Sequence, residues 1–278
     1  MEAMSPAADR GWWGRWFLRR IARPVVDYLP AMSLLAGLVV LWEVAVRVLN
    51  TKPYVLPGPV RIWDGFLRTK HLLPEHTETT LAAALAGLAV AAAVGVTLAG
   101  VIASVPLVRR VLYPILVVSQ TIPMIVLAPL LAIWFGFGLT PKVVVVALVG
   151  FFPIVVSTVD AIDSADEEMV GLVRSMGART WQVMRYVRVP SAVPGFFAGL
   201  KIASAYAVLA AIIGEWAGAT SGLGIYIQRS QASYRIDQVF VAIVIVALLS
   251  VALFAFVHVL SRVASPWKYV TQEEGQSQ

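Results

Sequence analysis

The sequence predicts an all-α membrane protein with six transmembrane helices and one polar segment on the cytoplasmic side. The first observation is composition: 59% of the 278 residues are hydrophobic and only 14% are charged, whereas a soluble domain carries about 25% charged residues. The second is the placement of charge, because none falls between Glu78 and Arg109, between Arg110 and Lys142, or between Asp237 and Arg262. Runs of this length are typical of helices that cross a bilayer, which need about 20 apolar residues.

These runs and their neighbours place the spans at about residues 31–49, 80–104, 111–135, 142–160, 195–214 and 238–260. The membrane domain is therefore expected to cover residues 31–264, with the polar segment at about 161–190. Residues 1–30 are expected to be a cytoplasmic or interfacial segment, because their aromatic residues and arginines share a helix that suits the headgroup region. Residues 265–278 are expected to be a cytoplasmic tail.

The arrangement of basic residues predicts the orientation. An even number of spans places both termini on one side, and cytoplasmic loops of membrane proteins are enriched in Lys and Arg. With both termini in the cytoplasm, 13 of the 22 Lys and Arg residues lie inside and 8 outside. The net charge of +6 is therefore interpreted as a sign of topology in a bacterial-type cytoplasmic membrane and not of nucleic-acid binding.

Several chemistries have no support in the sequence. There is no Gly-x-x-x-x-Gly-Lys-[Ser/Thr] phosphate-binding loop, no cysteine, and no metal-ligand spacing around the three histidines. Without a nucleophile and base in one constellation, an intramembrane enzyme is disfavoured. An ion-gradient-driven secondary transporter stays open as the alternative, but it predicts paired ionisable groups near the bilayer midplane and inverted repeats, and neither is evident.

The polar segment predicts two short amphipathic helices. Ser164 or Asp166 can cap the first, because a side-chain oxygen at that position accepts a free backbone amide. An apolar stripe at helical spacing follows, formed by Met169, Leu172, Val173 and Met176. Gly177 interrupts the pattern, and Pro190 and Pro194 are expected to end the second helix before the fifth span. The segment either lies on its own bundle or docks into a partner protein through this stripe.

The segment resembles the cytoplasmic coupling motif of ABC-importer permeases of the binding-protein-dependent class. That motif reads Glu-Ala-Ala, three residues, Gly, nine residues, Ile-x-Leu-Pro. Gly177 stands at its glycine, and the Val-Arg-Val-Pro sequence that ends at Pro190 stands at its end. The Glu-Ala-Ala positions hold Gly171, Leu172 and Val173 instead, and Glu167 lies one helical turn earlier.

The resemblance extends along the chain to the nitrate, sulfonate and taurine branch, which also includes permeases for pyrimidine precursors and riboflavin. It is carried by LWE at 41–43, LPGP at 56–59, TIPMIVLAPLLAIWFGFG at 121–138, FFPIVVSTVDAI at 151–162 and GEWAGATSGLG at 214–224. It implies the type I ABC importer permease fold and import of a small polar or anionic organic solute. It also implies a second permease chain in a homodimer, ABC ATPase subunits that bind ATP and Mg²⁺, and an extracytoplasmic solute-binding protein.

The resemblance and the residue patterns together give two sets of candidate site residues. The ATPase-coupling residues are Glu167, Gly171, Leu172, Val173, Arg174, Met176, Gly177, Arg179 and Pro190. The candidate pathway-lining residues are Gln120, Thr121, Pro123 and Glu215. Glu215 has a structural alternative, which is to fix the end of the fifth span by pairing with Arg229 or Arg235. The resemblance implies no cofactor and no metal in this chain itself.

Overall fold

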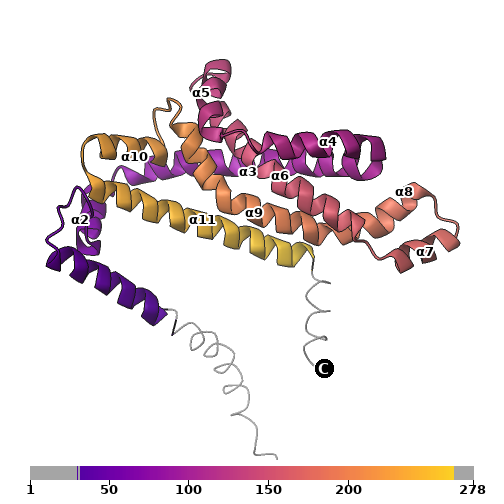
Figure 1. The fold of residues 1–278 in the computed structure, drawn as a ribbon, viewed down its shortest axis with the longest axis horizontal. Helices are drawn as coiled ribbons and strands as arrows, with labels where there is room; N and C mark the ends of the chain where they lie inside the picture. The colour runs from indigo at the N-terminus through magenta and orange to yellow at the C-terminus, as the bar shows by residue number, and fades with distance from the viewer. Residues whose placement is uncertain (1–29, 31, 266–278) are drawn as a thin grey trace, which may run out of the picture. The chain divides into compact units, whose positions relative to one another are not determined.

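The computed structural model describes residue 30 and residues 32–265, all of which lie in helices or connections (Figure 1). The predicted all-α class is confirmed in this part of the chain, while the predicted N-terminal segment and tail fall almost wholly outside the described residues. The chain divides into two compact units, Met1–Asp64 and Gly65–Gln278. Each is described by itself.

In the first unit, a carboxyl group fixes the start of a short helix. A helix over residues 32–48 lies within the predicted first span, and ten residues separate it from α2 (Pro59–Thr69). Glu43 forms an ion pair with Arg47, four residues later on the same helix, at 2.6 Å. Its other carboxyl oxygen accepts a hydrogen bond from the backbone N–H of Val60, at 3.2 Å. This amide belongs to the first turn of α2, where helix N–H groups lack helical partners.

The core of the second unit is built from three long helices. The helix α6 (Leu139–Asp163) packs against both α3 (Leu73–Ser104) and α9 (Val189–Glu215), and α11 (Ile236–Ala264) packs against α9 (Figure 1). Small side chains are frequent in the buried core. Helices approach closely in membranes where small residues line the contact.

The contact of α9 with α6 shows this close approach. A Cβ atom added to Gly199 would lie 2.5 Å from the carbonyl oxygen of Pro153 and 2.7 Å from the Cα of Ile154. One added to Gly195 would lie 2.6 Å from the carbonyl oxygen of Ser157. Gly195 and Gly199 therefore mark a point of close backbone approach between α9 and α6.

The predicted third span, 111–135, is wrong as a single helix. It consists of α4 (Pro106–Ser119) and α5 (Met124–Phe135), which meet at an angle of 99°. The break lies just before Pro123, because proline has no backbone N–H to donate and disfavours helical geometry in the residue before it. The hydroxyl groups of Ser119 and Thr121 also bond to carbonyl groups three residues earlier, which competes with the helical ladder.

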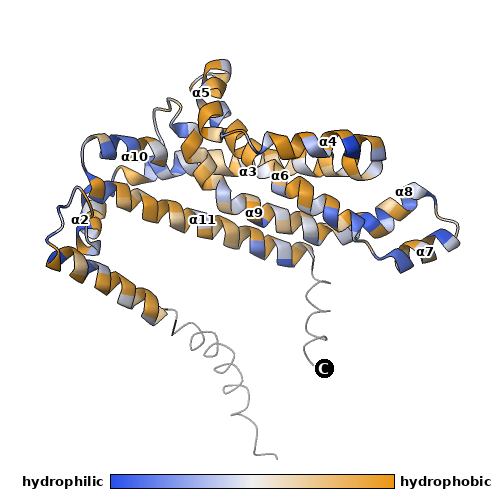
Figure 2. Ribbon diagram, in the orientation of Figure 1, coloured by the Kyte–Doolittle hydropathy of each residue, from blue (hydrophilic) through white to orange (hydrophobic). Residues whose placement is uncertain are grey.

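Four described helices are long and apolar enough to cross a membrane, or five if the bent pair counts as one span. The six-span count therefore stays a prediction. The long helices extend beyond the predicted spans: α3 begins at Leu73, seven residues before position 80, with Pro74 in its first turn and Glu75 close behind. The predicted spans are shorter than the helices because a run of apolar residues marks only the part of a helix inside the membrane. The polar residues at the ends of the helix continue it beyond that run. In Figure 2, hydrophilic residues gather at α7–α8 and at α10.

Candidate functional site

The polar segment folds as a capped helix followed by a tight turn. The helix α7 (Glu167–Ser175) is capped by the preceding residue, Asp166, whose side-chain oxygen accepts hydrogen bonds from the backbone N–H groups of Glu168 and Met169, at 2.8 and 3.3 Å. Of the two predicted caps, Asp166 is therefore the one that the chain uses. The cap satisfies amides that have no helical partner.

The segment has a small hydrophobic cluster of its own. Val170 of α7 is buried together with Val183 and Val187, and Val173 and Ala178 pack against them. Val173 was predicted to belong to the apolar stripe with Met169, Leu172 and Met176, and it is partly buried against this cluster. Because the cluster joins α7 to the chain after the turn, the segment has a defined shape without a partner protein.

The remaining residues of the predicted stripe are exposed. Met169 is 48% exposed, Leu172 57% and Met176 80%. Glu167, Gly171, Arg174 and Arg179 are also exposed. The structure therefore brings the predicted coupling residues, apart from Val173 and Pro190, to the surface of α7 and its following turn. An apolar stripe bordered by charged residues is a surface suited to protein docking.

Gly177 forms the turn that ends α7. Its φ is +86°, a left-handed conformation that residues with a Cβ adopt at a cost. Its N–H donates to the carbonyl of Arg174, at 2.9 Å, and the next N–H, of Ala178, donates to the carbonyl of Val173, at 3.2 Å. This pair of bonds is the Schellman motif, which satisfies the last carbonyl groups of a helix. The predicted interruption at Gly177 is therefore confirmed.

The prediction that Pro190 and Pro194 end the second helix is wrong. The helix α8 (Thr180–Val183) passes into a π-helical stretch, η1 (Met184–Arg188), and then directly into α9. Pro190 lies in the first turn of α9, and Pro194 lies inside it. The wider π-turn, in which the Val189 N–H donates to the Met184 carbonyl, accommodates the missing amide of Pro190. The whole stretch Thr180–Glu215 is one helical span of 36 residues.

The predicted pathway residues Gln120, Thr121 and Pro123 lie together at the break between α4 and α5. All three are exposed, and the side-chain amide of Gln120 donates to the Ser119 hydroxyl, at 3.3 Å. Irregular backbone at membrane depth is tolerated where it is buried in protein or lines a water-filled cavity. This position suits a pathway, and the lining role stays a prediction.

Glu215 differs from those three residues because it is fully buried, with 0% of its surface exposed. One carboxyl oxygen accepts a hydrogen bond from the Thr80 hydroxyl of α3, at 2.7 Å. The other accepts from the backbone N–H of Gly224, also at 2.7 Å, in the first turn of α10 (Leu223–Ala232). These bonds favour the structural alternative, although the partners are not the predicted arginines. Arg229 donates instead to the Thr220 carbonyl.

The connection between α9 and α10 is held by two further residues, Lys142 and His76, that the sequence analysis did not identify as site residues. Lys142, only 5% exposed, donates to the carbonyl of Ser221, at 3.1 Å, and His76 accepts from the N–H of Gly222, at 3.1 Å. In the sequence, Lys142 marks only the start of a predicted span, and His76 is one of three histidines without metal-ligand spacing. No local pattern indicates such partners, because they lie far from the loop in sequence.

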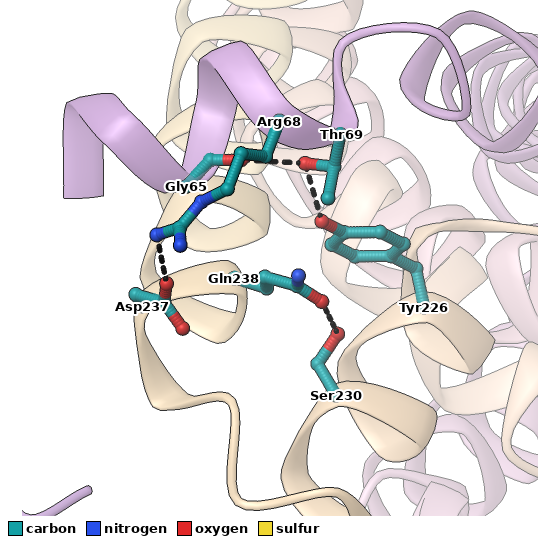
Figure 3. Close-up of polar contacts among 7 residues, drawn as sticks. All are labelled: Gly65, Arg68, Thr69, Tyr226, Ser230, Asp237 and Gln238. Carbon is teal, nitrogen blue, oxygen red and sulfur yellow. Dashed lines mark hydrogen bonds and ion pairs between the residues drawn. The ribbon is translucent and has the colours of Figure 1, made fainter. Parts of the chain in front are cut away.

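A second set of polar contacts ties α10 to its neighbours (Figure 3). The Tyr226 hydroxyl donates to the Thr69 hydroxyl at the end of α2, at 2.9 Å, and Arg68 pairs with Asp237 of α11, at 3.1 Å. Ser230 donates to the Gln238 side chain, at 3.3 Å. Burial raises the pKa of the Tyr226 phenol above its usual value, although the bond with Thr69 opposes this shift. The phenol therefore stays protonated as a donor at neutral pH.

Comparison with known proteins decides the family. Residues 91–265 match the family model described as binding-protein-dependent transport system inner membrane component. The chain belongs to this family. It is a permease subunit of an ABC importer, the predicted family is confirmed, and the secondary-transporter alternative finds no support.

Three similar relatives are transport permeases from bacteria. The formylaminopyrimidine transport permease protein ThiX of Halalkalibacterium halodurans is 38% identical over 83% of this chain and 92% of its own. The riboflavin transport system permease protein RibX of Chloroflexus aurantiacus is 34% identical over 90% of this chain and 93% of its own. The taurine permease protein TauC of Escherichia coli is 28% identical over 85% of this chain and 89% of its own.

A solved structure shows the same fold. The inward-facing methionine ABC transporter MetNI superposes with a TM-score of 0.63 at 20% sequence identity, over 71% of this permease and 98% of the matched chain. At that level of identity the similarity concerns the fold alone, and it confirms the type I importer permease fold.

The positive φ of Gly177 can be tested with two matched variants, Gly177→Ala and Gly171→Ala. Gly177 and Gly171 are both exposed, and a Cβ at either meets nothing within 4 Å. Gly177→Ala forces an alanine to positive φ, which costs about 1–2 kcal/mol, whereas Gly171→Ala should stabilise α7 by about 0.5–1 kcal/mol. Amide hydrogen exchange should therefore be faster across α7 in Gly177→Ala and slower in Gly171→Ala. Equal exchange in the two variants would contradict the assigned backbone geometry.

Proposed function

We propose that this permease forms the translocation pathway for a small polar or anionic organic solute and couples it to a separate ATPase through the polar segment. The observation that carries the proposal is the exposed stripe of Met169, Leu172 and Met176 on a helix that its own cap, turn and cluster hold in place. An apolar stripe on a rigid, charged segment is suited to fill a groove in a partner protein.

The proposal includes the assembly that the family implies. Two ATPase chains bind ATP and Mg²⁺ and hydrolyse the nucleotide, while this chain carries no catalytic role. An extracytoplasmic binding protein delivers the solute. In the proposed orientation both termini and the polar segment face the cytoplasm, which is the side favoured by the basic residues. The end of α9 at Glu215 then faces outward.

The pathway is proposed to pass the break between α4 and α5. Gln120 and Thr121 supply polar groups there, and Pro123 ends the helical hydrogen bonding that would otherwise occupy the backbone. Glu215 fits a pathway-lining role less well than Gln120 and Thr121, because both of its carboxyl oxygens already have hydrogen-bond partners within the fold.

The docking role is tested by Met176→Asp. Burying a methionine or leucine side chain is worth about 1.5–3 kcal/mol, so a charge at this position should weaken binding of the cognate ATPase about tenfold or more. Arg174→Glu should weaken it less, since exposed ion pairs are worth about 0–1 kcal/mol. The measurement is ATPase retention on the purified permease together with ATP-driven uptake in proteoliposomes.

A matched control is Tyr234→Asp. Tyr234 is 79% exposed, against 80% for Met176, but it lies between α10 and α11, and aspartate tolerates its φ of +55°. This variant should retain the ATPase. Native mass spectrometry of the wild-type complex should also show two copies of this chain. Full ATPase retention and uptake in Met176→Asp would refute docking through α7, and two different permease chains in one complex would refute the homodimer.

The substrate class rests on the relatives, whose names refer to a formylaminopyrimidine, riboflavin and taurine. A thermal-shift screen of the cognate binding protein with such solutes should give one strong response, since ligand at 100 times its Kd stabilises the native state by about 2.7 kcal/mol. A response only to sugars or to oligopeptides would contradict the proposed class.

A further inference from the structure

The connection between α9 and α10 is held by side chains at four consecutive residues. Lys142 binds the carbonyl of Ser221, and His76 accepts the N–H of Gly222. The Thr80 hydroxyl accepts the N–H of Leu223, at 2.8 Å, and Glu215 accepts the N–H of Gly224. These partners come from α3, α6 and α9, so the start of α10 is fixed to all three core helices.

Glu215 is central to this arrangement. Its two carboxyl oxygens link Thr80 of α3 directly to the first turn of α10. A Cβ on Gly222 would overlap the Glu215 carboxyl group, and Gly222 has a φ of +128°. The Gly-Glu-Trp-Ala-Gly-Ala-Thr-Ser-Gly-Leu-Gly sequence at 214–224 therefore contains both the acid and the glycine that makes room for it.

The polar segment lies at the other end of the long helix that ends at Glu215. The span Thr180–Glu215 has no break in its helical structure, and at 1.5 Å per residue it is about 50 Å long. Near its beginning, Val183 and Val187 pack against Val170 of α7. One continuous helix therefore has the proposed ATPase-docking helix α7 packed at one end and α10 hydrogen-bonded at the other.

We propose that Glu215 is a positioning residue that locks α10 to the end of α9, so that a displacement of α10 is transmitted along α9 to the polar segment. The proposal rests on the proposed coupling function. It assigns Glu215 a hydrogen-bonding role in which its net charge is not required, and it makes α10 the element through which binding protein on the outer face controls the ATPase.

The hydrogen-bond chemistry distinguishes this role from a charged pathway residue. In Glu215→Gln, the amide oxygen can still accept the Gly224 N–H. The new NH₂ group can donate to the Thr80 hydroxyl oxygen, which has two lone pairs. The Thr80 hydroxyl can then donate to the His76 carbonyl, which it already approaches at 3.0 Å. Glutamine therefore preserves every bond of the junction, whereas Glu215→Ala leaves the buried Gly224 N–H without its acceptor.

The test measures ATPase stimulation by the cognate binding protein on the full complex in proteoliposomes, with retention of the ATPase chain as the assembly control. Glu215→Gln should keep wild-type stimulation, and Glu215→Ala should lose it while retaining the ATPase chain. Thr80→Val should also lose stimulation, and Thr80→Ser, which restores the hydroxyl, should recover it. Glu78→Ala is the matched control, because Glu78 is exposed on the same helix two residues before Thr80.

The combined variant Glu215→Gln/Thr80→Val changes the hydrogen bonds of the junction without the cavity that Glu215→Ala leaves. It keeps the shape of both side chains, but it leaves the glutamine NH₂ group and the Leu223 N–H without the Thr80 oxygen, so it should lose stimulation although Glu215→Gln does not. Hydrogen exchange at the first amides of α10 should rise in the same variants that lose stimulation.

Two results would overturn the proposal. Loss of stimulation in Glu215→Gln as severe as in Glu215→Ala would show that the charge is required, and full stimulation in Glu215→Ala would show that the junction transmits nothing. Failure of the underlying function is distinguishable, because a wild-type complex that binds no ATPase or shows no stimulation would refute the coupling role itself.

Discussion

The hydrogen bond from the Gly224 N–H to the Glu215 carboxyl, at 2.7 Å, is the interaction on which the arrangement of α9 and α10 depends. The first amides of any helix lack partners inside that helix, and an unpaired buried amide costs about 1–3 kcal/mol. In α10 this requirement is met by a side chain of the preceding core helix. Satisfying the amide therefore also fixes the position of one helix on another, which a local cap does not do.

The chain uses the same solution in its first unit. There Glu43 accepts the N–H of Val60 in the first turn of α2, and a Cβ on Gly58 would lie 2.6 Å from its carboxyl oxygen. In each unit an acid on a long apolar helix captures an amide of the next short helix, and a glycine directly before that helix makes room. By contrast, α7 has a local cap at Asp166. The short helices α2 and α10 are thus held by their neighbours, whereas α7 is completed by its own sequence.

This difference explains how much of the structure could be predicted. The cap at Asp166, the turn at Gly177 and the pair of Glu43 with Arg47 involve residues within a few positions of one another, and local patterns indicate them. The contact of Thr80 with Glu215 joins residues 135 positions apart, so no local pattern specifies it. The prediction that Pro190 ends a helix was wrong, because a π-turn directly before the proline keeps the helix continuous into α9. The sequence places Pro123 inside the predicted third span, but it does not indicate a break of 99° there, because the size of the bend depends on how α4 and α5 pack.

The proposed coupling requires α9 and the helical turns before it to act as one rigid element between the two ends of the permease. The chain contains no cysteine, so spin labels can be placed at Tyr186 and Leu209, both exposed and on either side of Pro190 and Pro194. Their backbone separation should be about 35 Å. Pulsed electron paramagnetic resonance of the complex, in its resting state and with ATP and binding protein, should give the same distance in both. A distance that changes between the states would mean that α9 bends at its π-turn or prolines, and it would contradict transmission along a rigid helix.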